Sequence, residues 1–205
     1  MVRETKFSPE GGVDCYPLSP LQQGMLFHRW QGGAPGVDVE QVICELRERI
    51  QAARFEQAWR DVIARHAALR TAFYWEDGMP PRQVVRPPAS VPLNFYQAEF
   101  GSEQEARLGL EEYLAADRQQ GFITLMPPLL RVALLRGGPQ HFWLVVTYHH
   151  LALDARSMTL MFKEAFDRHD ALVQGRELEL PAPRAYRTYI DWLQTHDLKR
   201  AEAFW

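Results

Sequence analysis

The chain has 205 residues, 46% of them hydrophobic and 24% charged, with a formal net charge of −3. This length and composition are average for a globular domain with a real hydrophobic core, and one domain, or one plus a fragment, fits better than two. The acidic balance disfavours a nucleic-acid partner, and no apolar run reaches the ~18 residues that would indicate a membrane partner.

Residues 1–13 are polar and charged, and we expect a leader or linker that lacks the apolar core of a secretory signal. The two cysteines, Cys15 and Cys44, form neither a CxxC pair nor a disulfide framework. A cytoplasmic protein with free thiols is therefore expected. The paired cysteine and histidine spacing of a structural zinc site is absent, so no bound metal is expected.

The first helix is predicted to begin at Ser19. Ser19 can cap a helix, Pro20 suits its first turn, and Gln22 occupies the acceptor position of a capping box. The helix is expected to stop near Gly32 and Gly33.

The next segments alternate between strand and helix patterns. Residues 39–46 alternate in polarity like a strand, and residues 52–68 form an amphipathic helix. Residues 71–75 are rich in strand formers, 76–78 read as a turn, and 82–85 as the returning strand.

The second half repeats this alternation. A mostly exposed helix is predicted over residues 102–120 and a strand over 129–135, followed by a hairpin turn at Gly137 and Gly138. Residues 142–148 (FWLVVTY) are nearly all apolar, as expected for a strand at the centre of a sheet. A helix is predicted from Ala155 to Gly175.

The end of the chain consists of a loop over residues 176–183 and an amphipathic segment over 186–205. Two large aromatic residues, Phe204 and Trp205, end it without a cap, which suggests that the last helix has lost a packing partner. The whole pattern predicts an α/β fold: a mixed sheet with flanking helices.

The sharpest local feature is the hexapeptide HHLALD, residues 149–154, which follows the apolar strand and precedes a helix. Such strand ends are where α/β folds place reactive groups. Because adjacent side chains of a strand point to opposite faces, only one of His149 and His150 is expected to face a cavity. The other should pack or hydrogen-bond behind it, which also disfavours a metal site built from both histidines and Asp154.

Asp154 has two main interpretations. It could cap the following helix, or it could be a buried carboxylate paired with Arg65 or Arg70 that fixes the loop holding the histidines. For the arginines, the competing interpretation is a solvated helix face. A catalytic base is the least favoured role for Asp154, because an ionised carboxylate is a weak base at neutral pH.

HHLALD resembles the HHxxxDG motif of the condensation domains of nonribosomal peptide synthetases, which share a superfamily with chloramphenicol acetyltransferase. Leu18–His28 (LSPLQQGMLFH) and Arg65–Phe73 (RHAALRTAF) resemble two further motifs of this family, in the same order. Tyr186–Trp192 is similar to the segment that leaves the first lobe. The sequence departs from the pattern at Ala155, where the family usually has glycine, and at Arg156, where a bulky apolar residue is usual.

The resemblance implies a chloramphenicol-acetyltransferase-like fold, with residues 14–175 as the N-terminal lobe of a condensation domain. Residues 176–205 would be the crossover loop and helix that begin a missing C-terminal lobe. The implied reaction is amide-bond formation between a donor acyl or peptidyl thioester and an acceptor aminoacyl amine. Both are carried on the phosphopantetheine of carrier proteins, and the domain itself binds no cofactor directly.

In this family pattern His150 is the catalytic residue, and His149, Asp154, Arg65 and Arg70 support its loop. The implied partners are donor and acceptor peptidyl carrier proteins, the C-terminal lobe and a neighbouring adenylation domain. We expect the chain alone to be inactive. The alternatives are a non-catalytic lobe that binds a carrier protein and an epimerisation domain of the same superfamily.

Overall fold

The computed structural model describes residues 11–30, 36–76 and 78–196. The helices and strands in chain order are β1 (Asp14–Pro17), α1 (Pro20–Trp30), β2 (Val39–Leu46), α2 (Ala52–Arg65), β3 (Thr71–Glu76), β4 (Met79–Val85), β5 (Asn94–Glu99), α3 (Glu103–Gln120), β6 (Leu130–Gly138), β7 (His141–His149), α4 (Ala155–Gln174) and α5 (Tyr186–Gln194). Short 3-10 turns occupy Ala67–Arg70 and Pro88–Ser90.

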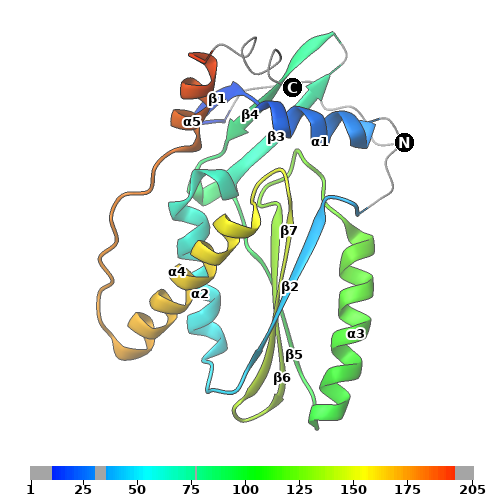
Figure 1. Cartoon of the computed structure of the whole chain (residues 1–205). Coiled ribbons are helices and arrows are strands. Elements are labelled where there is room, and N and C mark those ends of the chain that lie inside the picture. The colour runs from blue at the N-terminus through cyan, green and yellow to red at the C-terminus, as the bar shows by residue number, and fades with distance from the viewer. Residues whose placement is uncertain (1–10, 31–35, 77, 197–205) are drawn as a thin grey trace.

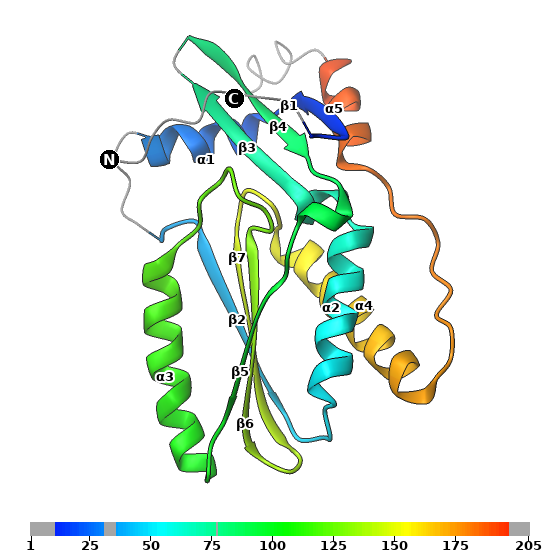
Figure 2. The same cartoon turned by 180° about the vertical axis from the view of Figure 1, so that it is seen from behind.

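The strands form two sheets. The larger has the order β2-β7-β6-β5, antiparallel except for the parallel pair β5 and β6, and the smaller has the order β1-β4-β3. Helices α2 and α4 cover one face of the larger sheet and α3 covers the other (Figure 1). The smaller sheet lies beyond one end of the larger one, beside α1 and α5, and Figure 2 shows the same arrangement from behind.

The apolar strand β7 explains why the larger sheet has helices on both faces. Alternate residues of β7 face in opposite directions. Phe142 and Leu144 pack in the core beneath α2 and α4, whereas Trp143 and Val145 pack against α3. All nine residues of β7 are buried, which confirms the prediction of a central strand.

A third packing region joins the two sheets. Leu18 and Leu26, from the start of the chain, pack with Phe73 of β3 and with Leu151 of the segment after β7. On the same face of the small sheet as Phe73, Ile190 of α5 is buried against β1 and β4. The end of β7 therefore lies where the two sheets meet.

The structure corrects several predicted boundaries, and β4, for example, begins at Met79 instead of residue 82. Helix α2 ends at Arg65 instead of residue 68, because His66 is extended and the chain then tightens into a 3-10 turn. The hairpin turn is at residues 139–140, and Gly137 and Gly138 remain in β6. A Cβ on Gly137 would lie 2.8 Å from the Trp143 ring, so this glycine permits close packing instead of making the turn.

Strands β1 and β5 were not predicted from the sequence. Each lies at the edge of its sheet, and every residue of β5 is at least partly exposed. Such edge strands carry no alternation strong enough to detect, and the pairing partner supplies the stability.

Several predicted features lie outside the described residues: the leader over residues 1–10, Gly32 and Gly33, Asp77, and the chain end with Phe204 and Trp205. Helix α5 ends at Gln194 with Thr195 as its C-cap, and it is therefore shorter than the predicted amphipathic segment over 186–205. In the part of the chain that the structure describes, none of the helices combines the length and apolar character needed to cross a bilayer.

Candidate active site

The two histidines diverge at the end of β7, as the alternation rule predicts. His149 is the last residue of the strand and is only 1% exposed. Its Nδ1 accepts a hydrogen bond from the Leu151 backbone N–H at 3.1 Å, and its ring stands edge-on to Phe122. The neutral ring therefore carries its proton on Nε2, and His149 packs behind the loop.

His150 lies on the other side of the chain and lines a pocket. Its backbone N–H donates to the Asp38 carbonyl at 2.8 Å, which ties the loop to the start of β2. Its Nδ1 is 2.9 Å from the Leu153 carbonyl oxygen. Because a carbonyl only accepts, Nδ1 must carry the proton, and the lone pair of the neutral imidazole is on Nε2.

Asp154 caps helix α4. Its carboxylate accepts a hydrogen bond from the Ser157 backbone N–H at 2.7 Å. Hydrogen bonds from Ser157 lower the pKa of Asp154, and the nearby His150 lowers it further. Ala155 is the first residue of α4, and none of the described non-glycine residues has a positive φ, so alanine is free of strain where the family usually has glycine.

The predicted pairing of Asp154 with Arg65 or Arg70 is wrong in this structure. Arg65 forms an ion pair with Glu164 of α4, with Nε 3.2 Å from the carboxylate, and donates to the Pro181 carbonyl. Arg70 is buried and donates to the backbone carbonyls of Ile63 and Arg86. Arg65 still lines the pocket with His150, whereas Arg70 holds the turn after α2 to the end of β4.

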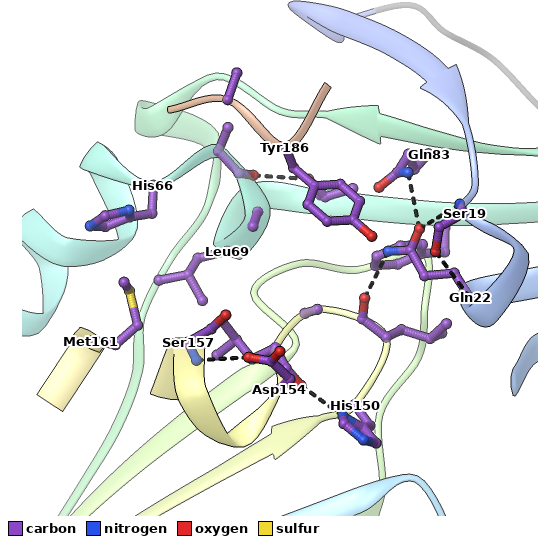
Figure 3. A pocket seen from close by; sticks show the side chains of 18 of the residues that line it. Ser19, Gln22, His66, Leu69, Gln83, His150, Asp154, Ser157, Met161 and Tyr186 are labelled. Atoms are coloured by element: carbon purple, nitrogen blue, oxygen red, sulfur yellow. Dashed lines mark hydrogen bonds between the residues drawn. The ribbon is translucent and has the colours of Figure 1, made fainter. Parts of the chain in front are cut away.

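The pocket lies between the histidine loop, α1, the turn after α2 and the start of α4 (Figure 3), and has a volume of about 520 Å³. Its walls are mainly apolar, with Met25, Leu69 and Met161 among the lining residues. Polar and charged residues make up nearly half of the lining, and Ser19 and Tyr186 are among them. A cavity that combines apolar walls with convergent polar groups is the usual form of a small-molecule site.

The structure adds Gln22 to the site, where the sequence indicated only a capping box. That capping box is confirmed, since Ser19 N–H donates to Gln22 Oε1 at 3.0 Å and Gln22 N–H donates to Ser19 Oγ at 3.2 Å. In addition, Gln22 Nε2 donates to the Leu151 carbonyl at 3.0 Å, directly beside His150 (Figure 3). A contact across 129 residues leaves no signal in a single sequence.

A second polar group of the pocket wall is His66, which falls within the predicted helix over residues 52–68 but lies just after the end of α2. His66 Nε2 is 2.7 Å from Glu164, and Arg168 binds the same carboxylate. Burial opposes ionisation of Glu164, but the hydrogen bonds from His66 and Arg168 outweigh it and lower its pKa. This network joins α2 to α4 at the edge of the pocket.

Of the two imidazoles on the pocket wall, that of His66 is paired with Glu164, whereas that of His150 is held in one tautomer by the Leu153 carbonyl. His150 Nε2 can orient or accept a proton from a nucleophile bound in the cavity. The geometry does not favour a metal site built from His149, His150 and Asp154. The ring of His149 is buried behind the loop, and the Asp154 carboxylate caps α4.

The mixed sheet with flanking helices on both faces has the chloramphenicol-acetyltransferase-like fold. Crystal structures of the starter condensation domain of rhizomide synthetase and of the first condensation domain of the CDA synthetase superpose with TM-scores of 0.80 and 0.76. They share 21% and 17% identity, and the matches cover 93% and 83% of this chain. They cover only 46% and 42% of the solved chains.

The condensation-domain family model matches residues 13–205, so the chain belongs to the condensation-domain family. A linear gramicidin synthase of Brevibacillus parabrevis is 36% identical over 192 residues, which are 94% of this chain and 2% of that protein. Bacitracin synthase 3 of Bacillus licheniformis is 32% identical over 190 residues, which are 93% of this chain and 3% of that protein. The chain thus spans a small part of these synthases and less than half of the solved condensation domains.

Proposed function

We propose that this chain is the N-terminal lobe of a condensation domain that forms an amide bond between two carrier-bound substrates. The amine of an acceptor aminoacyl thioester attacks the carbonyl carbon of a donor acyl or peptidyl thioester. The C–S bond of the donor then breaks, and the lost amine proton ends on the leaving thiol or in solvent. The observation that carries the proposal is the position of His150, on the pocket wall with its Nδ1 proton held by the Leu153 carbonyl.

The reaction needs no covalent nucleophile from the protein, because a thioester is already activated. This agrees with a sequence that has no G-x-S-x-G nucleophile elbow and no evident cysteine–base motif. The two substrates would be presented on the phosphopantetheine arms of the carriers, with no cofactor bound by the chain itself. A mutant of the starter condensation domain of rhizomide synthetase has been crystallised in complex with C8-CoA.

The role of His150 can be assessed from pKa values. An α-amino group titrates near ~7.7–8.0, so about a third is neutral at pH 7.5, and removing its proton before attack costs less than ~1 kcal/mol. After attack, the amine of the tetrahedral adduct is strongly acidic and a neutral imidazole can take its proton. Orientation of the amine is worth several kcal/mol as well. We therefore assign His150 both roles, as orienter and as proton acceptor.

The same proposal assigns the remaining parts of the chain. Residues 14–175 form the first lobe, and residues 176–205, including α5, lead toward a second lobe. The partners are donor and acceptor carrier proteins, the second lobe and an adjacent adenylation domain, in the cytoplasm. His149, Asp154, Arg65 and Arg70 shape the surroundings of His150 through the contacts described above.

The test is His150→Ala in the complete condensation domain, with His28→Ala, on the exposed surface of α1, as the control. We expect His150→Ala to lower condensation of matched aminoacyl carriers by a factor of about 10² or more, the usual range for a lost acid–base group. The circular dichroism spectrum should not change. Wild-type turnover in His150→Ala would overturn the assignment, and carrier binding without turnover in the wild type would favour a purely binding lobe.

A further inference from the structure

We propose that Gln22 is a positioning residue for His150: its side-chain amide holds the Leu151 carbonyl and thereby fixes the conformation of the histidine loop. The inference rests on the proposed function of His150 but concerns a different residue on a different element. Gln22 is in the first turn of α1, and its link to the loop bridges two walls of the pocket (Figure 3).

The orientation of the Gln22 amide is fixed by two donors on its oxygen. Ser19 N–H and Gln83 Nε2 both donate to Gln22 Oε1, at 3.0 and 3.2 Å. Gln83 is itself held, because its Nε2 also donates to the Pro17 carbonyl at 2.9 Å. With Oε1 committed in this way, the Gln22 amide nitrogen is directed at the Leu151 carbonyl.

The network is built in the interior rather than on the surface. Gln22 is 7% exposed and Gln83 is 1% exposed. Buried polar side chains persist where they are hydrogen-bonded, and a fully connected set restricts its neighbours to one arrangement. The network runs from Gln83 of β4 through Gln22 of α1 to the Leu151 carbonyl in the loop that follows β7.

The capping role does not account for this contact. A capping box uses only the side-chain oxygen, and glutamate serves as well as glutamine in that position. The Nε2 donor of Gln22 is therefore available for a second task, and Leu151 is the residue directly after His150. Two residues further on, the Leu153 carbonyl accepts the hydrogen bond from His150 Nδ1. The Leu151 carbonyl that Gln22 binds is therefore in the same short loop as the group that holds the His150 ring.

Two substitutions on the same helix separate the alternatives. Gln22→Glu keeps the oxygen that caps α1, but an ionised carboxylate cannot donate to the Leu151 carbonyl. Gln23→Glu is the matched control: Gln23 Nε2 also donates to a backbone carbonyl, that of Leu18 at 3.1 Å, and the charge change is the same. If Gln22→Glu does not fold, Gln22→Met takes its place, with Ser19→Ala as the control that weakens the capping box but keeps the Gln22 amide donor.

The first measurement is made on this chain by NMR. We expect Gln22→Glu, but not Gln23→Glu, to shift the Leu151 and Ala152 amide signals and to populate the second tautomer of the His150 ring. Lowering the pH should restore the wild-type amide pattern in Gln22→Glu, since a protonated carboxyl group can again donate to the Leu151 carbonyl. A general loss of stability would not recover in this way.

The second measurement is kinetic and uses the complete condensation domain. Misplacement of a reacting group by about 1 Å costs up to ~10²-fold in rate, so we expect Gln22→Glu to lower kcat by about tenfold or more. The KM for the acceptor carrier should stay within about twofold of the wild type, and Gln23→Glu should match the wild type in both constants.

The outcomes separate the two proposals. If Gln22→Glu behaves like Gln23→Glu in the spectra and in kcat, the positioning role of Gln22 is overturned while the role of His150 stands. If His150→Ala keeps full activity, the proposed function fails, and the NMR comparison alone then decides whether Gln22 holds the loop.

Discussion

At Asp154 a single carboxylate satisfies a backbone N–H at the start of a 20-residue helix. Loss of such a cap typically costs ~1 kcal/mol, so we expect Asp154→Ala to lower the melting temperature by about 2–4 °C. Asp154→Asn should lose less, because an amide oxygen can also accept from Ser157. Differential scanning calorimetry of the three proteins checks this. Equal melting temperatures for Asp154→Ala and the wild type would contradict the capping role.

The Asp154 carboxylate should also make the free energy of unfolding depend on pH. Because Ser157 lowers the pKa of Asp154 in the folded chain, the unfolded chain binds its proton more readily. The stabilisation is therefore present above the unfolded pKa, near ~3.9, and is lost as the pH falls through the lower folded value. Urea unfolding between pH 5 and pH 2 should show this decline in the wild type and a smaller one in Asp154→Asn. Parallel profiles would mean that Asp154 does not contribute.

The sequence predicted the functional residues only where they are local. The divergence of His149 and His150 follows from strand alternation, and the capping interpretation of Asp154 follows from its place before a helix. The pairing of Asp154 with Arg65 was wrong because nothing in the sequence places Glu164 beside that arginine. The contact from Gln22 to Leu151 was likewise out of reach, since it joins distant parts of the chain.

Helix α3 is anchored to β6 by a buried ion pair. Arg131 Nε is 2.5 Å from Asp117 Oδ1, and both side chains are at least nine-tenths buried. The Arg131 guanidinium also lies 4.0 Å from the centre of the Phe122 ring, which in turn contacts His149. The ion pair thus supports the surface against which His149 packs.

Removal of one partner of this pair should be costly. Asp117→Ala leaves a buried guanidinium uncompensated, and we expect the free energy of unfolding to fall by ~3–5 kcal/mol. The control is Arg107→Ala, which removes an exposed pair with Glu103 on the same helix and should cost less than ~0.5 kcal/mol. Urea titration followed by tryptophan fluorescence measures both. Similar losses in the two variants would show that the buried pair is not the anchor of α3.

Elements with a strong sequence pattern were predictable, including the edge strands β2 and β3, whereas the edge strands β1 and β5 were not. Helices α3 and α4 agree closely with their predicted ranges because apolar periodicity and terminal caps mark them, and the central strand β7 does so because its residues are nearly all apolar. Strands β1 and β5 depend on partners far away in the chain. Gly137 stays in β6 for a packing reason, contact with Trp143, which local turn rules do not contain.

At the scale of the whole molecule, the pocket is a product of the two sheets and not of either one alone. The histidine loop comes from the end of the larger sheet, whereas Gln83 and Phe73 come from the smaller sheet. Hydrophobic periodicity predicts each layer separately, but the angle at which the sheets meet depends on side-chain packing such as that of Leu26 and Leu151. The mixed α/β class was therefore predictable, and the pocket was not.

The proportion of a condensation domain that this chain spans leads to the last prediction. Solved relatives are more than twice as long as the part they share with it, so a second lobe would have to supply the remaining contacts to both substrates. Without them, we expect the donor thioester and the acceptor amine not to be held together, so that the advantage of orientation, worth several kcal/mol, is lost.

We therefore expect less than about 1% of the turnover from this chain as from a version extended through the second lobe, a difference of ~3 kcal/mol in activation free energy. Condensation assays with matched aminoacyl carriers measure both proteins, and titration of this chain with a loaded carrier separates weak binding from absent chemistry. The extended version carrying His150→Ala measures the turnover that remains without the imidazole. Turnover by this chain comparable to that of the extended protein would show that one lobe suffices to bring the amine and the thioester together.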